Sequence, residues 1–415
     1  MTKRTALGGA LAALCLTTAL AQPALAGEVK IWTLTYNSDG AAQAWAKIVS
    51  DFEAANPGIT IKIENRSTDE HKAALRVAAQ SDQGPDIYFM WAGLGLGGEF
   101  VNAGMSKPLD DYYAQYGWDD RLMGTAKGFT TNYPPQRHGV PITFRGESIY
   151  YNKALFEKAG ITELPTSYDA LKADAQKLKD AGVAAFSFGG TVNWHLMRLM
   201  DVILEAKCGA AQHDALMAMS ADWSTEPCAI QSFTELSEWS QNYILSPFMG
   251  IDQAQSTNLF IAGKSAMALE GDWFVSQMRD AGLTEEQLGI FPFPTGTDRL
   301  YGFGENFYIS SKSQVADDAA KFLDFMISDA VQQEHLGAFS SISVNKNVKY
   351  ENVAPLDQTW MDIFAKYTAV YMNGDQAFPL DVTTEYFRII NEVASGNLTP
   401  EDAAKGMQTF IAGRG

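Results

Sequence analysis

The alternation of apolar strands and amphipathic helices near the start of the chain constrains the fold most strongly. Three short apolar segments have the composition of β-strands: residues 28–35, 59–67 and 85–91. Two longer segments between them carry apolar side chains at helical spacing: residues 41–58 and 69–84. Because this alternation is typical of sheets covered by helices, we expect an α/β lobe whose sheet is largely parallel.

The same alternation returns further along the chain. Strands are expected at residues 147–152 and 184–190, and a helix at 167–182 follows the start signal Pro165-Thr166-Ser167. No repeat of fixed period and no Pro/Gly/Ser-rich linker separates the two regions. We therefore expect two α/β lobes joined by ordered crossings, with a ligand-sized cleft between them.

The first 26 residues have the layout of a secretory signal peptide. Lys3 and Arg4 precede an apolar run over residues 6–21, and small residues lead up to Ala26. The run is shorter than the roughly 20 residues that a membrane-spanning helix needs. We expect cleavage near Ala26, export to the periplasm, and removal of Cys15 with the signal.

Cysteine content and charge narrow the chemistry. Cys208 and Cys228 remain after cleavage, and in an oxidising compartment such a pair most simply forms a disulfide, with two free buried thiols as the alternative. The whole chain has 31 basic and 49 acidic residues, so loss of Lys3 and Arg4 leaves 29 basic residues and a net charge of −20. Such a surface disfavours nucleic acids and anionic membranes as partners. We expect a monomer.

Aromatic and hydrogen-bonding residues occur together where the predicted strands end, which is where α/β sheets bind ligands. These residues are Tyr36, Asn37, Ser38, Thr68, Asp69, Trp91, Asn193, Trp194, His195, Asp272 and Trp273. Indole and phenol rings pack on the apolar faces of sugars, while carboxylates, amides and guanidinium groups bind the hydroxyl groups. The pattern favours a carbohydrate site, with Trp273 as a stacking platform and Asp272 holding its loop.

The tryptophans divide into two groups. A lid over the core and a ligand contact are both open for each of four residues: Trp32, Trp91, Trp194 and Trp273. A structural role is expected for the five that lie away from predicted strand ends: Trp45, Trp118, Trp223, Trp239 and Trp360.

Four further polar residues each have two interpretations. Asp86, next to Pro85, caps a turn or binds ligand, and the glycines that flank Glu305 favour a ligand contact there. Arg145 forms a salt bridge or contacts ligand. His195 is a polar neighbour of Trp194 or, less simply, a base or metal ligand.

Enzyme signatures are missing from the sequence, so we expect no catalytic residue, cofactor or metal. The glycine-rich residues 91–100 lack the spacing of a phosphate-binding loop, and neither a Gly-x-Ser-x-Gly nor a His-Glu-x-x-His motif occurs. Tyr150 and Tyr151 could suggest ferric-ion binding. Consecutive strand residues point to opposite faces, however, so we expect one of the two tyrosines in the core.

Four segments together resemble the family 1 extracellular solute-binding proteins, which serve bacterial ABC importers of carbohydrates: residues 84–113, 139–182, 260–274 and 319–328. The resemblance extends over almost the whole chain after the signal. "YYNKALFEKAGI" followed by Pro165 and Ser167, together with "GKSAMALEGDW", is its most specific part. The glycine-rich "AGLGLGG" departs from relatives that carry a charged residue there, so a maltose-like hydroxyl pattern is not implied.

The resemblance implies two lobes that close on a sugar and present the closed form to a membrane permease. By alignment with the family, the chain crosses between lobes near Ile149, Tyr308 and Val344. One lobe then holds residues 27–148 and 308–344, and the other holds 149–307 and 345–415. The family pattern also assigns sugar contacts to three residues: Trp273, Asp69 and Trp91.

The favoured hypothesis is therefore a periplasmic receptor for a mono- or oligosaccharide. The alternatives are an exported carbohydrate-active enzyme, or the same fold binding iron or a phosphorylated polyol.

Overall fold

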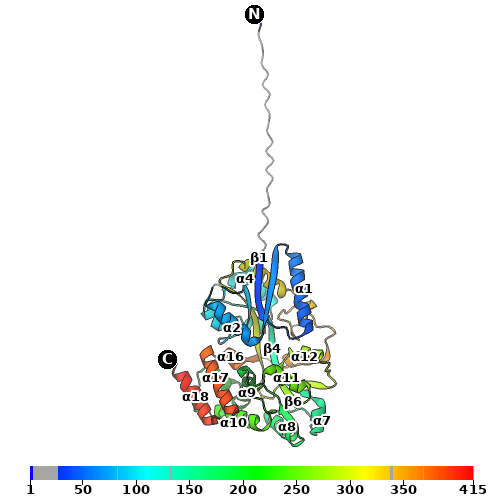
Figure 1. Cartoon of the computed structure of the whole chain (residues 1–415), viewed down its shortest axis with the longest axis vertical. Coiled ribbons are helices and arrows are strands. Elements are labelled where there is room, and N and C mark those ends of the chain that lie inside the picture. Colours follow the sequence, from blue (N-terminus) through cyan, green and yellow to red (C-terminus); the bar gives the residue numbers. More distant parts are fainter. Residues whose placement is uncertain (3–26, 82, 131–132, 337–339, 368, 415) are drawn as a thin grey trace.

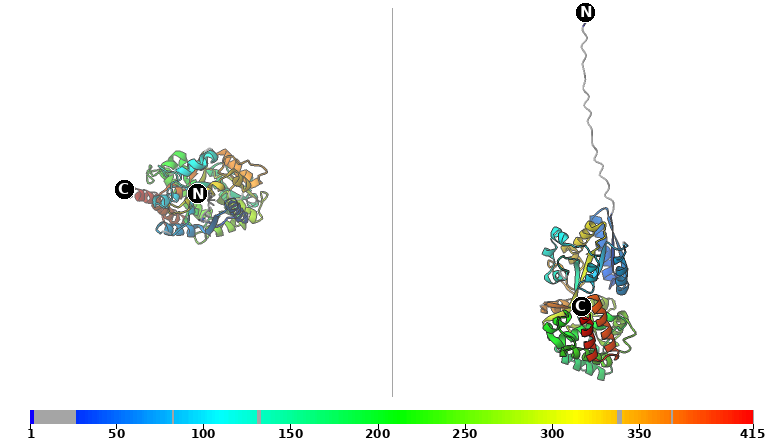
Figure 2. Two further views of the ribbon diagram at one scale, coloured as in Figure 1. Left: turned by 90° about the horizontal axis from the view of Figure 1, so that it is seen from above. Right: turned by 90° about the vertical axis from the view of Figure 1, so that its left-hand side faces the viewer.

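A computed structural model describes residues 1–2, 27–81, 83–130, 133–336, 340–367 and 369–414. The predicted signal segment falls almost entirely on residues outside this set. The chain folds into two α/β lobes, one above the other in Figure 1, with the C-terminus at the surface of the lower lobe. The right-hand view of Figure 2 shows the same two lobes, one above the other, from the side.

The first lobe is built on the strands predicted from the start of the sequence. Strand β1 (Gly27–Leu34) lies between β2 (Ile59–Arg66) and β3 (Ile87–Trp91), and both pairs are parallel. The helices of this lobe are α1 (Asp39–Ala55), α2 (Thr68–Ala79), α3 (Gly97–Asn102), α4 (Asp110–Tyr116), α5 (Trp118–Arg121), α6 (Gly124–Gly128), α13 (Ala316–Met326) and α14 (Asp329–Glu334).

Helix α1 shows why these residues adopt helical structure. The Ser38 side chain accepts a hydrogen bond from the backbone N–H of Ala41 and so caps the first turn. Trp45, Ile48 and Phe52 follow at helical spacing and are buried against the sheet and α13. Burial of each such side chain stabilises the lobe by about 1.5–3 kcal/mol.

Two long strands connect the lobes. Strand β8 (Arg299–Ile309) runs antiparallel to β3 and to β4 (Val140–Asn152), so the expectation of a largely parallel sheet is wrong at this point. The reason is that β8 enters the first lobe from the second and not through a local strand–helix–strand unit. Strand β4 pairs with β8 as far as Gly146, and from Glu147 onward it pairs with β6 (Ser265–Gly271).

The second lobe contains the remaining elements. Its short strands are β5 (Ala184–Phe186), β7 (Leu288–Phe291) and β9 (Ala369–Met372). Its helices are α7 (Lys153–Lys158), α8 (Tyr168–Asp180), α9 (Asn193–Met217), α10 (Pro227–Asn242), α11 (Gln253–Ile261), α12 (Phe274–Asp280), α15 (Pro355–Lys366), α16 (Gly374–Ala377), α17 (Leu380–Ala394) and α18 (Pro400–Ala412).

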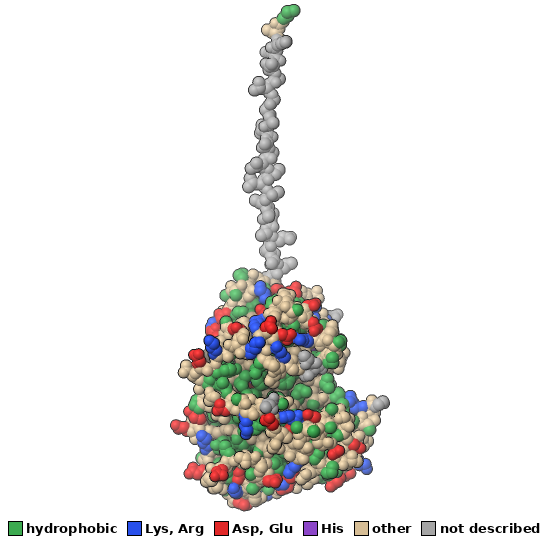
Figure 3. All heavy atoms as spheres, turned by 180° about the vertical axis from the view of Figure 1, so that it is seen from behind, with side chains coloured by type: hydrophobic (Ala, Val, Ile, Leu, Met, Phe, Trp, Pro, Cys, Tyr) green, Lys and Arg blue, Asp and Glu red, His purple; other side chains and the backbone are tan. Residues whose placement is uncertain are grey.

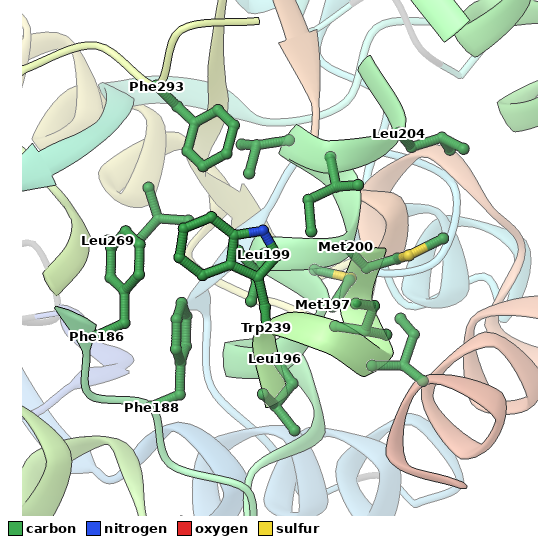
Figure 4. Close-up of a cluster of buried hydrophobic side chains, with 14 of the residues drawn as sticks. Phe186, Phe188, Leu196, Met197, Leu199, Met200, Leu204, Trp239, Leu269 and Phe293 are labelled. Atoms are coloured by element: carbon green, nitrogen blue, oxygen red, sulfur yellow. The ribbon is translucent and has the colours of Figure 1, made fainter. Parts of the chain in front are cut away.

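The largest hydrophobic core lies in the second lobe, around helix α9. Figure 4 shows Phe186, Phe188 and Trp239 packed beside leucines and methionines of α9. A disulfide between Cys208 and Cys228 joins α9 to α10, as the sequence predicted. The five tryptophans expected to be structural are all buried: Trp45, Trp118, Trp223, Trp239 and Trp360.

The face opposite to that of Figure 1 exposes hydrophobic side chains at the waist between the lobes (Figure 3). Among the described residues, no helix combines the length and apolar character needed to cross a membrane.

Candidate functional site

A cavity of about 140 Å³ lies between the lobes, and both contribute to its wall. The lining residues are Leu34, Asn37, Thr68, Lys72, Trp91, Leu96, Trp194, Met197, Arg198, Gln253, Trp273, Gln277, Phe303, Glu305, Asn373, Asp375 and Gln376. Strand ends and helix starts supply most of them, as the position of ligand sites in α/β sheets predicts.

The indole ring of Trp273 packs against Gly271, two positions before it. A Cβ added at Gly271 would lie 1.8 Å from the Cζ3 atom of the indole, so only glycine leaves room for the ring. Phe303 packs against the same ring with 5.6 Å between centroids. Trp273 is therefore placed before any ligand arrives, which lowers the ordering cost of stacking.

Trp194 and Arg198 form a second part of the wall in the first turns of α9. The Arg198 guanidinium lies 4.8 Å from the Trp194 ring centroid and 5.1 Å from that of Trp273. It therefore lies close to two indoles that also face the cavity. Arg198 follows Trp194 by four residues, the spacing that places two helical side chains on one face.

Two carboxyl groups balance the charge of buried Arg198. Its Nε lies 2.7 Å from Glu147 Oε1, and its Nη1 donates to Glu270 Oε2 at 2.8 Å. Burial raises the pKa of Glu147 to about 8, although Arg198 opposes this. Burial acts on Glu270 in the same direction, but Arg198, His195 and Gln253 outweigh it and lower the pKa of Glu270 to about 2. Near neutral pH, Glu147 is then largely protonated beside an ionised Glu270.

A second buried arginine, Arg145, also lies near Trp273. Arg145 Nε donates to Glu305 Oε2 at 2.9 Å, and its Nη1 donates to Asp272 Oδ2 at 3.3 Å. The guanidinium lies 5.8 Å from the Trp273 ring centroid. Burial raises the pKa of Asp272 to about 6, with Arg145 acting against the shift.

The first lobe contributes Trp91 and Lys72. Lys72 Nζ lies 5.0 Å from the Trp91 ring centroid, and the ring packs edge to face on Phe89 at 4.8 Å. Burial lowers the pKa of Lys72 and raises that of Asp375 across the cavity, and the attraction between the two charges opposes both shifts.

The glycine-rich loop after β3 touches the second lobe directly. The Leu94 N–H donates to the Gln376 carbonyl oxygen at 2.7 Å. A Cβ at Gly93, whose φ is 103°, would lie 2.4 Å from that same oxygen, and a Cβ at Gly95 would lie 2.4 Å from the Asp375 carbonyl oxygen. The glycines therefore allow the backbone of the loop after β3 to approach the backbone of Asp375 and Gln376. This close contact between the lobes, and not phosphate binding, explains the glycines.

Four residues that line the cavity carry a buried polar atom without a hydrogen-bond partner among the described residues. The one on Arg198, its Nε, is ion-paired with Glu147, and the other three have no such ion pair. These atoms are Trp194 Nε1, Asn373 Oδ1 and Gln376 Oε1. Buried polar groups are usually paired, and leaving one unpaired costs about 1–3 kcal/mol. A ligand with hydroxyl groups would satisfy both the donor and the two acceptors.

Five of the predicted ligand-binding residues line the cavity: Asn37, Trp91, Trp194, Trp273 and Glu305. The other six lie outside its lining: Tyr36, Ser38, Asp69, Asp86, Arg145 and His195. Thr68 and Asp69 are the first residues of α2, which starts one residue earlier than the predicted helix, and Trp194 and His195 lie in the first turn of α9.

Four of the residues outside the lining have structural contacts: Tyr36, Ser38, Asp86 and His195. Tyr36 stacks on Trp45 at 6.2 Å, and Ser38 caps α1. Asp86 accepts hydrogen bonds from Lys30 N and Ser313 Oγ, which are both far away in the chain, so its carboxylate links separate segments and does not cap its own turn. His195 is buried, where its Nδ1 accepts a hydrogen bond from Gly189 N.

Sequence reasoning missed several cavity residues. Lys72 and Arg198 lie one turn after predicted site residues, so helical spacing could have identified them. Asn373, Asp375 and Gln376 lie in and before the short helix α16, and no local pattern marks them. Only the fold brings them to the cavity.

The described residues contain no group of three or more His, Cys, Asp or Glu side chains arranged to hold a metal ion. Tyr150 is fully buried, and its hydroxyl donates to the Gly271 carbonyl and accepts from Trp360 Nε1. Tyr151 is partly buried and packs on Phe156.

Two α/β lobes linked by shared strands, with a ligand-sized cavity between them, define a two-lobed binding protein. The family model of bacterial extracellular solute-binding proteins matches residues 37–333, and the chain belongs to that family.

Named relatives share about a quarter of their residues with the chain. A maltotriose-binding protein of Pyrococcus abyssi is 26% identical over 306 residues, which is 72% of this chain and 62% of the relative. A multiple sugar-binding protein of Streptococcus mutans is 22% identical over 335 residues, 75% of this chain and 74% of the relative.

Solved structures show the same fold. A chitin oligosaccharide binding protein superposes with a TM-score of 0.83 at 23% identity, covering 93% of this chain and 98% of that protein. The solute receptor AcbH, described as having an exclusive preference for β-D-galactopyranose, superposes with a TM-score of 0.80 at 16% identity, covering 92% of this chain and 98% of the receptor.

Proposed function

We propose that the chain is the periplasmic substrate-binding protein of an ABC importer and that it binds a mono- or oligosaccharide in the cavity between its lobes. The observation that carries this proposal is the composition of the cavity wall. Indole rings from both lobes lie beside buried polar atoms that have no hydrogen-bond partner among the described residues.

This wall matches the chemistry of a sugar. The apolar faces of a pyranose pack on Trp91, Trp194 and Trp273, and its hydroxyl groups bond to Asn373, Gln376 and the Trp194 N–H. The buried cations Arg145 and Arg198 each lie between two carboxyl groups, so neither offers an unbalanced charge to iron-binding anions or a phosphate ester. The relatives named for maltotriose and multiple sugars support the same ligand class.

The remaining parts of the proposal follow from the family. The sugar would bridge the lobes and favour the closed state, because only a ligand with higher affinity for that state can shift the equilibrium. The closed form would then be delivered to membrane permease subunits. We further propose that residues 1–26 are removed near Ala26, that the mature protein is a periplasmic monomer, and that the chain crosses between lobes near Ile149, Tyr308 and Val344.

A thermal-shift screen of the mature protein tests the ligand class. The panel should contain mono- and oligosaccharides, sugar acids, polyols, phosphorylated polyols and ferric ion. A ligand at about a hundred times its Kd stabilises the folded state by about 2.7 kcal/mol, which raises the Tm measurably. A response to one sugar, with the sugar recovered unchanged, is expected. A response confined to ferric ion or phosphate esters, or sugar turnover, would overturn the proposal.

A further inference from the structure

Asp272 contacts the segments that connect the two lobes, which we call the hinge, although it does not line the cavity. It is 2% exposed and stands between Gly271, the last residue of β6, and the Trp273 platform. Its backbone N–H donates to the Gly146 carbonyl at 3.1 Å. Gly146 is the last residue of β4 that pairs with β8 before β4 turns to β6, so this bond is made where β4 passes between the lobes.

The carboxylate of Asp272 reaches the other two connections. Its Oδ2 pairs with Arg145, and Arg145 also binds Glu305 on β8. The same Oδ2 accepts a hydrogen bond from the backbone N–H of Ser341 at 3.2 Å. Ser341 precedes the residues that return to the first lobe, where Met123 N donates to Val344 O, and its hydroxyl donates to Asp357 on α15 of the second lobe.

The buried side chain of Asp272 therefore contacts, directly or through Arg145, the three segments that connect the lobes. The next residue, Trp273, lines the cavity. The Trp273 ring lies directly against the backbone of Gly271, since a Cβ there would lie 1.8 Å from its Cζ3 atom, so the ring is packed on the residue next to Asp272. Arg145 contacts both ends of this arrangement, since its guanidinium also lies near the Trp273 ring.

We propose that Asp272 is a positioning residue that couples occupancy of the Trp273 platform to lobe closure. In the observed arrangement, Asp272 of the second lobe holds Arg145 and Ser341 in place, and these contacts stabilise the closed relative to the open state. Removing its charge shifts the lobes toward the open state and weakens ligand binding without removing a ligand contact. The expected effect on ligand affinity rests on the proposed sugar-binding function, whereas the expected effect on the balance of open and closed lobes does not.

Asp272→Asn is the sharpest variant, because it keeps the size of the side chain and an acceptor for Ser341 while it removes the charge facing Arg145. Glu235→Gln is the matched control. Glu235 is also a buried, paired carboxylate of the second lobe, but its partners are Lys172, Lys207 and Tyr168, away from the crossings. If Asp272→Asn fails to fold, Arg145→Lys tests the same contact, since a lysine cannot bridge two carboxylates with the fixed fork of arginine.

Two measurements separate the hinge from the ligand. Small-angle X-ray scattering of ligand-free protein reports the balance of open and closed lobes, and calorimetry with the responding sugar reports Kd. We expect Asp272→Asn to enlarge the ligand-free radius of gyration, to raise Kd about tenfold, and to reach the wild-type radius at saturating sugar. Glu235→Gln should change neither radius nor Kd.

The outcomes are distinct. A ligand-free radius and Kd equal to wild type in Asp272→Asn would overturn the inference, as would equal changes in Glu235→Gln. A higher Kd with an unchanged ligand-free radius would also overturn it, because Asp272 would then act on the ligand and not on the hinge. If wild-type protein binds no sugar, the proposed function fails, and scattering of the ligand-free variants still decides the role of Asp272.

Discussion

Two buried arginines flank Trp273, and each lies between two carboxyl groups, yet they connect different parts of the molecule. Arg198 joins Glu147, Glu270 and the indoles of the second lobe, so its contacts lie within one lobe. Arg145 joins Asp272 of the second lobe to Glu305 on β8, so its contacts cross between lobes. The difference teaches that the same arrangement of charges builds part of the cavity wall at Arg198 and connects the two lobes at Arg145.

The largest effect is expected from Arg198→Met, which breaks the first arrangement. The change leaves two carboxyl groups buried without their cation, so the free energy of unfolding should fall by about 3–5 kcal/mol, and sugar binding should be lost with the support of both indoles. Urea unfolding and calorimetry measure the two effects. Arg299→Met is the control, because Arg299 also binds two acids, Glu205 and Asp214, without lining the cavity. Loss of sugar binding in the control as well would contradict a specific role for Arg198.

Trp273→Ala removes the ring that both arginines flank. We expect the affinity for sugar to fall by about 2 kcal/mol or more, roughly thirtyfold, since a pre-placed indole in a buried wall is typical of a binding hot spot. The fold should persist, because the ring is only partly buried. Trp32→Ala is matched to it: Arg66 lies 4.1 Å over the Trp32 ring, which does not line the cavity. Unchanged binding by Trp273→Ala in calorimetry would remove the residue from the site.

Gly271→Ala displaces the same ring without deleting it. The added methyl overlaps the indole, and overpacking of this kind costs about 1–3 kcal/mol. We expect the Kd for sugar to rise about tenfold with a smaller loss of stability than for Arg198→Met. At Gly124 a Cβ would meet nothing within 4 Å, so Gly124→Ala serves as control. A crystal structure of Gly271→Ala with the ring in place would show that the glycine is not needed for its position.

The smallest effect is expected from Glu147→Gln, read as a function of pH. The folded state raises the pKa of Glu147 from 4.5 to about 8, so it binds the proton more tightly than the unfolded state does. Its contribution to stability is therefore fully present below about pH 4.5 and is lost as the pH rises toward 8. The variant should lack this loss, so between pH 5 and pH 8 its free energy of unfolding should fall less with rising pH than that of wild type.

The contribution of Asp272 to stability should be lost over a narrower pH range than that of Glu147, so the two carboxyl groups can be compared. The pKa of Asp272 rises from 3.8 only to about 6, so the loss should be complete near pH 6 to 7. Urea unfolding of Glu147→Gln and Asp272→Asn across this pH range compares the two clusters. Parallel pH profiles for the two variants would show that the clusters do not titrate separately.

Local sequence patterns predicted much of the first lobe and the aromatic part of the cavity. The strands around Ile31, Ile61 and Phe89 and the helix bearing Trp45 form as expected, because each is encoded by periodicity over a few residues. Trp91 ends β3, Trp273 follows the end of β6, and Trp194 lies in the first turn of α9, and all three line the cavity between the lobes. The antiparallel pairing of β8 was not predicted, because the sequence of Arg299–Ile309 does not show which strands lie beside it.

The sequence alone therefore determined the α/β class, the disulfide partners and the residue types that suit a sugar, because composition and short-range spacing carry that information. Only the tertiary structure decided which polar groups join the tryptophans. Asn373 and Gln376 come to the cavity from the segment at α16, and Asp272 meets Gly146, Arg145 and Ser341 across long stretches of chain. Such contacts depend on how two lobes pack together, and local residue patterns do not encode that packing.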